Sequence, residues 1–208
     1  MMNRRFVVLA TLAGMSAAAF GAAMASPFDP ETIQSAAKKV RPTICLLNYT
    51  IETESKRTGE PRKRSTRAMG VIVSPDGLVM SHGHMQSDKA DPSNIRVTVG
   101  EGDDEKEYDG VLLKKPDDVN VCFVRIQTED DERFPHLTFA QNAEPELGSP
   151  LLLFGIMGES LDFARGAVVR MISAVIEKPR MTYCLDDAVP FGYVGAPVID
   201  ARGRVAGV

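Results

Sequence analysis

The sequence predicts an all-β fold preceded by one short helix. From residue 42 onward, short apolar runs alternate with clusters of turn residues, a pattern typical of a β-barrel or a β-sandwich. The chain has 208 residues, the usual length of one domain or of two half-domains that share a core. Its hydrophobic content of 44% is that of an ordinary globular protein and gives no sign of disorder.

The predicted helix has a clear start signal. Asp29 is a suitable N-cap, Pro30 fits the first turn, and Glu31 lies near the positive end of the helix dipole. We expect the helix to run to about Val40 and to end before Pro42.

The strands are predicted from apolar runs that end at turn residues. One tight turn, Pro75-Asp76-Gly77, has glycine where a positive φ is needed. The expected strands are Thr43–Thr50, Ala68–Ser74, Leu78–His82, Ile95–Val99, Gly110–Lys114, Val119–Ile126, Pro150–Gly155, Arg165–Ile176 and parts of Ala188–Val208.

Three segments between the predicted strands are strongly charged. Residues 55–67 are basic, and residues 101–107 and 129–132 are acidic. We interpret all three as solvated hairpin tips that keep strand edges from pairing with other chains. An alternative for the basic segment is a docking site for an anionic partner.

The N-terminus has the features of an export signal. Arg4 and Arg5 precede an apolar run, and Ala23-Met24-Ala25 forms an A-x-A cleavage site. The sequence therefore predicts cleavage after Ala25, a mature domain of residues 26–208, and a periplasmic or secreted location. Two alternatives stay open: twin-arginine export, and retention of the apolar run as a membrane anchor.

The charge balance limits the classes of partner. The net charge is −4, and removal of the export segment with its two arginines makes the remainder more acidic. An acidic chain gives no general reason to expect nucleic-acid binding. Membrane contact is expected only through an uncleaved export segment.

The three cysteines, Cys45, Cys122 and Cys184, are an odd number for an exported protein. At least one must be a free thiol or form an intermolecular bridge. Cys45 and Cys122 lie in apolar, strand-like runs, so we expect both to be small buried side chains.

Several motifs occur in an order that points to one family. The segment from Gly192 to Pro197, G-Y-V-G-A-P, resembles the nucleophile loop G-N-S-G-G-P of trypsin-like serine proteases, with valine in place of serine. The segment from Gly70 to His84 resembles the G-V-I-V-x-x-D-G-x-I-L-T-N-x-H signature of their HtrA-like branch. Residues 120–126, 147–155 and 170–174 resemble later strands of the same branch, so the resemblance covers roughly residues 30 to 208.

The resemblance implies a fold of two packed six-stranded Greek-key barrels, at about residues 42–130 and 138–208. It also assigns the catalytic triad positions. His84 stands at the catalytic histidine, Asn120 at the aspartate and Val194 at the serine. The backbone amides of Gly192 and Val194 would correspond to the oxyanion hole, which uses N–H groups rather than side chains.

The substitutions at two triad positions remove the chemistry that the family performs. Valine has no nucleophilic atom. Asparagine in the carboxylate role costs about 10⁴ in turnover in a trypsin-like protease. We therefore expect a proteolytically inactive homologue, without a cofactor, that binds a peptide or protein or regulates an active protease relative. Two alternatives are a residual hydrolase that uses His84 with an unidentified nucleophile, and a structural envelope protein.

The pair His82 and His84 also suggests a metal site. Residues i and i+2 of a strand face the same side, and Asp88 or Asp91 could be a third ligand. A closed structural zinc site needs four ligands, and no second cluster is present in the sequence. We therefore predict no metal.

The last motif strand, Arg204 to Val208, coincides with the end of the sequence. Family members continue into a further strand and often into a peptide-binding domain. Either the sequence is a fragment, or the last strand of the second barrel is missing. In the second case, the open sheet edge would be a site for strand addition by another chain.

Overall fold

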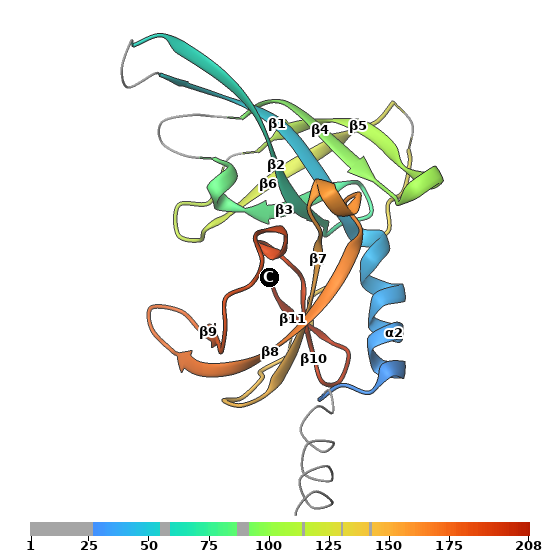
Figure 1. Cartoon of the computed structure of the whole chain (residues 1–208), viewed down its shortest axis with the longest axis vertical. Helices are drawn as coiled ribbons and strands as arrows, with labels where there is room; N and C mark the ends of the chain where they lie inside the picture. The colour runs from blue at the N-terminus through green and yellow to red at the C-terminus, as the bar shows by residue number, and fades with distance from the viewer. Residues whose placement is uncertain (1–26, 55–58, 87–91, 114, 130, 142) are drawn as a thin grey trace, which may run out of the picture.

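A computed structural model describes residues 27–54, 59–86, 92–113, 115–129, 131–141 and 143–208 (Figure 1). The predicted export segment 1–25 lies outside these residues, as do the tip of the basic segment at 55–58 and the proposed metal ligands Asp88 and Asp91. Among the described helices, none combines the length and apolar character that a membrane span requires.

The predicted helix is α2 (Pro30–Val40), with the expected N-cap. The Asp29 carboxylate accepts a hydrogen bond from the Thr32 backbone N–H at 2.8 Å, and hydrogen bonds from Thr32 lower the pKa of Asp29. Ala36 and Val40 are the buried residues of the helix. They belong to the same hydrophobic cluster as strand β7, so the helix is held by packing as well as by its cap.

The first half of the chain forms a closed six-stranded barrel, as the resemblance implied (Figure 1). The barrel order is β1-β2-β3-β6-β5-β4, and every neighbouring pair is antiparallel. The strands are β1 (Ile44–Glu54), β2 (Pro61–Ile72), β3 (Leu78–His82), β4 (Ser93–Val99), β5 (Lys106–Leu112) and β6 (Val121–Gln127).

Side chains along each strand point alternately into the barrel and out of it, and those that point inward fill the interior. Cys45 and Cys122 are fully buried there, as predicted, together with Val79, Val97 and Val124 among others. None of the three cysteines forms a disulfide. Burial raises the pKa of the Cys45 thiol to about 12 and that of Cys122 to about 11, so both remain protonated.

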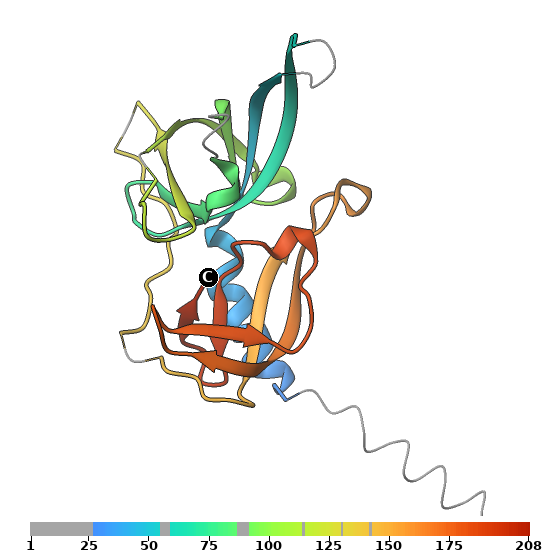
Figure 2. The same cartoon turned by 90° about the vertical axis from the view of Figure 1, so that its left-hand side faces the viewer.

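The second half of the chain forms an open, curled sheet rather than a closed barrel (Figure 2). Its order is β11-β10-β7-β8-β9. The prediction of two six-stranded barrels is thus confirmed for the first and only partly for the second: among the described residues, β9 and β11 each pair with one neighbour. The strands are β7 (Pro150–Ile156), β8 (Arg165–Ile176), β9 (Thr182–Leu185), β10 (Val198–Asp200) and β11 (Val205–Gly207).

The strand boundaries differ from the prediction where exposed polar residues pair across strands. β2 begins at Pro61 instead of Ala68, so most of the described basic segment is strand and not a hairpin tip. Its polar residues lie opposite those of β1, and Lys63 forms an ion pair with Glu52 at 3.8 Å. Such pairs stabilise a strand without an apolar pattern, so sequence periodicity does not find them. β5 begins four residues early, at Lys106, and β9 was not predicted.

The barrel and the open sheet share one continuous hydrophobic cluster. It contains Ile44, Met69 and Val71 of the barrel together with the apolar residues of β7. At the edge of this cluster, Arg165 of β8 donates to the Ile44 carbonyl at 2.8 Å and pairs with Glu101 at 2.8 Å. The side chain of Arg165 is 6% exposed, so this ion pair ties the two halves together largely away from water.

Candidate functional site

Two neighbouring strands bring the first two candidate residues together. β3 ends at His82, which lies opposite Val121 at the start of β6, and Asn120 directly precedes β6. His84 follows in a short 3-10 turn, η2 (Gly83–Met85). The Gly83 N–H donates to the Asn120 carbonyl at 2.8 Å, which fixes the turn against the segment before β6.

A chain of side-chain contacts runs through this turn. The Asn120 amide nitrogen lies 3.1 Å from His82 Nε2, and His82 Nδ1 lies 2.8 Å from His84 Nδ1. The resemblance assigned Asn120 the position that orients His84, but in the structure His82 stands between them. Sequence reasoning gave His82 a role only in the metal hypothesis. Its i, i+2 spacing to His84 was the signal that the two rings share one side of the chain.

Lys115 begins this chain of contacts, and no motif in the sequence marks it. Its ammonium group lies 3.3 Å from Asn120 Oδ1 and 3.4 Å from the Gly83 carbonyl oxygen. Glycine at position 83 makes this approach possible. A Cβ there would lie 2.3 Å from Asn120 Oδ1 and 2.9 Å from the Lys115 Cε.

Both histidines are held in the neutral form. The pKa of His82 is lowered by burial and by the nearby Lys115 charge. The pKa of His84 is lowered by burial and by His82. Since an unperturbed imidazole titrates near 6.5, both rings are neutral at pH 7.

The third candidate residue, Val194, follows a 3-10 turn, η5 (Phe191–Tyr193). The Val194 N–H donates to the Phe191 carbonyl at 3.1 Å, and the Tyr193 N–H donates to Pro190 at 2.9 Å. The Val194 amide, which we expected to contribute to an oxyanion-hole-like site, is therefore engaged within its own loop in this structure. The turn itself uses that donor.

Glycines place the loop against both halves of the molecule. A Cβ on Gly192 would lie 1.8 Å from the Ile156 carbonyl oxygen of β7. Gly195 has φ +82° and lies close to His82, whose backbone nitrogen would be 3.2 Å from a Cβ at position 195. These close approaches require glycine, and the second brings the loop to the end of β3.

Two cavities meet at Tyr193 and Val194, between the barrel and the sheet. One, of about 490 Å³, is lined by His84, Val194, Phe191 and mostly apolar side chains of β1, β2 and β7. The other, of about 620 Å³, is lined by His82, Asn120 and Val194 and by residues of β9 and β11. His84 and Asn120 thus line two adjoining cavities, and Val194 lines both, although the three residues come from distant parts of the sequence.

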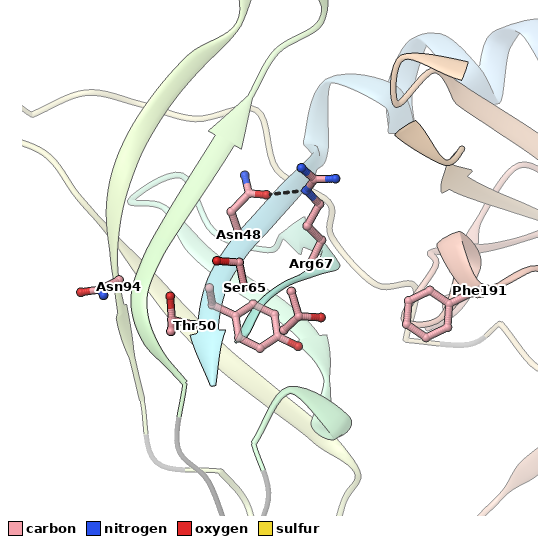
Figure 3. A pocket seen from close by; sticks show the side chains of 8 residues that line it. Asn48, Thr50, Ser65, Arg67, Asn94 and Phe191 are labelled. Carbon is pink, nitrogen blue, oxygen red and sulfur yellow. Dashed lines mark hydrogen bonds between the residues drawn. The ribbon is translucent and has the colours of Figure 1, made fainter. Parts of the chain in front are cut away.

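A third cavity, of about 460 Å³, has a polar lining that the sequence did not indicate (Figure 3). Asn48, Thr50 and Ser65 line it on the first hairpin, with Asn94 of β4. Arg67 donates to Asn48 Oδ1 at 3.1 Å. Phe191 lines both this cavity and the 490 Å³ cavity, and 74% of its surface is exposed.

Two serines and one cysteine use their donor groups in bonds to backbone carbonyls. Ser81 is the closest in sequence to the histidines, but it is buried and donates to the Met69 carbonyl at 2.7 Å. Ser173 donates to the carbonyls of Cys184 and Leu185. The protonated thiol of Cys122 contacts the His82 carbonyl oxygen at 3.4 Å.

Among the described residues, no group of three or more His, Cys, Asp or Glu side chains is arranged to hold a metal ion. The hypothetical third ligands Asp88 and Asp91 lie outside those residues, so the metal hypothesis keeps only His82 and His84.

Residues 68–208 match the family model of the trypsin-like peptidase domain, so the chain belongs to this family. It is 25% identical over 149 residues to the mitochondrial serine protease HTRA2 of Bos taurus, which confirms the resemblance to the HtrA-like branch. That match covers 67% of this chain and 30% of the length of the relative. The crystal structure of Deg5 has the same fold, with a TM-score of 0.63, 14% identity, and coverage of 88% of this chain and 87% of the other.

Proposed function

We propose that this protein is an exported, proteolytically inactive trypsin-like domain that binds an extended polypeptide segment in the cleft between barrel and sheet. Through this binding it acts as a peptide-binding module or as a regulator of an active protease relative. The observation that carries the proposal concerns Val194. Its side chain has no nucleophilic atom, and its backbone N–H donates to the Phe191 carbonyl within the loop.

The geometry around the histidines supports the absence of hydrolysis. A general base must be oriented by a third group that stabilises its protonated form. Here the neighbour of His84 is another histidine, and beyond it lie a neutral amide and the Lys115 ammonium group. A positive charge at the end of this chain opposes protonation of the rings instead of favouring it.

The two cavities at the cleft support binding of a polypeptide. Both are lined largely by apolar side chains and carry few polar groups, as binding sites for apolar ligands do. Phe191 is exposed beside His84, with ring centroids 6.0 Å apart, and offers a large apolar contact at low entropic cost. Among the described residues, β9 and β11 are the edge strands of the sheet, and both line the larger cavity. The Val205 carbonyl of β11 accepts from the Ala140 N–H at 3.0 Å, so β9 is the edge that we propose for strand addition.

Two measurements test inactivity. A fluorophosphonate probe labels only an activated serine, so the protein should remain unlabelled beside a labelled active trypsin. Casein and peptide esters should be cleaved no faster than by the His84→Ala variant. Turnover that His84→Ala abolishes would favour the residual hydrolase, and would require a serine other than those described above.

A peptide array tests binding and separates this proposal from a purely structural envelope role. Selected peptides should bind the wild-type protein. Phe191→Ala should lower their affinity about tenfold, the effect of losing one well-packed aromatic anchor. Leu147→Ala is the matched control, since Leu147 is 67% exposed and lines neither cleft cavity. Equal binding by all three proteins would contradict the cleft as the binding site.

Export remains part of the proposal and rests on the sequence of residues 1–25. N-terminal sequencing of the protein from the periplasm or medium should begin at Ser26. Recovery of the chain with an intact Met1 from the cytosol would contradict export.

A further inference from the structure

The amide of Asn120 can take only one orientation beside Lys115. An ammonium group has three donors and no acceptor, so the atom that faces it must be the amide oxygen. The amide NH₂ group then faces His82 Nε2 at 3.1 Å. A hydrogen bond to a charged group is stronger than one between neutral groups, so this contact decides the orientation.

The orientation of the amide fixes the tautomer of His82. The Nε2 atom accepts from the Asn120 NH₂ group and therefore carries no proton. In a neutral imidazole the proton must then sit on Nδ1. A proton on His82 Nδ1 would point at His84 Nδ1, 2.8 Å away, and be donated to it.

The same step fixes the tautomer of His84. Because its Nδ1 accepts from His82, its proton sits on Nε2. His84 lines the 490 Å³ cavity beside Phe191 and Val194. The ring therefore offers an N–H donor, whereas the general base of a serine protease offers an unprotonated Nε2.

One other set of tautomers is available, and Lys115 opposes it. The His84 backbone N–H donates to His82 Nδ1 at 3.2 Å, and this contact favours the second set because an accepting Nδ1 carries no proton. His82 would then carry its proton on Nε2, and the Asn120 amide would have to turn its oxygen toward it. The amide NH₂ group would face the Lys115 ammonium, donor against donor. We take the charge-assisted contact at Lys115 to outweigh the His84 N–H contact.

We propose that Lys115 is a positioning residue that acts through Asn120 and His82 to hold His84 as an Nε2–H hydrogen-bond donor in the cleft. The ligand atom that this donor selects is an acceptor, a backbone carbonyl oxygen of the bound polypeptide. This last assignment rests on the proposed function, whereas the tautomers of the free protein do not.

The test is long-range ¹H–¹⁵N NMR of the histidine ring nitrogens in the ¹⁵N-labelled protein at pH 7.5, without ligand. The wild-type spectrum should show a protonated Nε2 and an unprotonated Nδ1 for His84, with the reverse for His82. In Lys115→Met the Asn120 amide is free to turn. The proton should then move to Nε2 in His82 and to Nδ1 in His84. Lys115→Arg keeps a cationic donor and should keep the wild-type pattern.

His136 is an internal control for folding in these variants. Its Nδ1 lies 3.2 Å from the Phe134 carbonyl oxygen, far along the chain from Lys115, and its tautomer should not change. A wild-type His84 protonated on Nδ1 would overturn the proposal. An unchanged pattern in Lys115→Met would do the same for the role of the lysine.

The outcome is separable from that of the proposed function. Detection of hydrolysis would refute inactivity and leave the tautomers as measured. The carbonyl assignment is tested with peptides in which a single amide is replaced by an ester, which weakens one carbonyl acceptor. Such a peptide should bind the wild-type protein less tightly than the unmodified peptide. In His84→Phe the ester and amide peptides should differ in affinity by less than twofold. An equal loss of affinity in wild type and His84→Phe would refute the carbonyl assignment.

Discussion

At the scale of single residues, the loss of hydrolysis that we propose would have more than one cause. Val194 removes the nucleophile, and Asn120 removes the carboxylate. The structure adds two obstacles. The Val194 N–H is bonded within its own loop, and His82 separates Asn120 from His84. Restoring two side chains leaves both of these obstacles in place.

We therefore expect that Asn120→Asp combined with Val194→Ser does not restore a protease. The new carboxylate would pair with Lys115 and His82, and the new serine would lie in a loop without its oxyanion donor. The measurement is fluorophosphonate labelling together with casein hydrolysis. Labelling of the introduced serine in the double variant would show that the loop rearranges and that the two substitutions alone cause inactivity.

The two histidines also predict a dependence of stability on pH. Their folded pKa values lie below 6.5, the value expected in the unfolded chain, because of burial and neighbouring charge. Below about pH 6.5 the unfolded chain therefore binds more protons. The free energy of unfolding should fall as the pH drops from about 6.5 through the folded pKa values.

This dependence can be measured by urea unfolding at pH 7.5 and pH 5. The double variant His82→Gln with His84→Gln should lose less stability between these values than wild type. The lowered pKa values of Asp29, Asp76 and Asp200 affect stability mainly below about pH 5, outside this window. Identical losses in wild type and the double variant would contradict the effect.

At the scale of elements, the sequence predicted those parts whose signal is local. The cap at Asp29, the turn at 75–77 and the apolar strands of the barrel were all predicted, because each depends on neighbouring residues. β9 and the first half of β2 were missed. Their residues are polar or exposed, and they become strands through a partner that lies elsewhere in the sequence.

For the candidate site, too, the sequence predicted the features with a local signal and missed those that depend on distant residues. Motif order predicted that His84, Asn120 and Val194 lie near one another, and in the structure they line two adjoining cavities. The insertion of His82 between two of them depends on the register of β3 against β6, which no motif contains. Lys115 lies in an irregular segment before β6 and has no pattern that marks it. These side-chain contacts between neighbouring segments could therefore be found only in the structure, and not predicted from the sequence.

The turn after β3 yields a prediction about packing. In Gly83→Ala, the new Cβ would lie 2.3 Å from Asn120 Oδ1 and 2.8 Å from the Asn120 carbonyl carbon, so the chain must shift. We expect a destabilisation of about 1–3 kcal/mol, as for overpacking elsewhere. Gly158→Ala is the control, because a Cβ at Gly158 would meet nothing within 4 Å. Urea unfolding measures both, and equal midpoints would contradict the close approach.

At the scale of the whole molecule, the cleft depends on how the barrel and the open sheet are joined. The two halves share a hydrophobic cluster, and polar contacts join them at its edge. Arg165 is the central residue of these contacts, since it reaches from β8 to Ile44 and to Glu101. Glu101 also pairs with Arg41, which follows the helix, so helix, barrel and sheet meet at one carboxylate.

Arg165→Met should therefore destabilise the protein although methionine fits an apolar site. Removing one partner of a buried pair costs about 3–5 kcal/mol, and we expect the lower end because Glu101 is 37% exposed. Lys63→Met is the matched control. It removes the exposed pair with Glu52 and should cost less than about 1 kcal/mol. Urea midpoints compare the two, and an Arg165→Met midpoint no lower than that of Lys63→Met would show that the apolar cluster alone holds the two halves together.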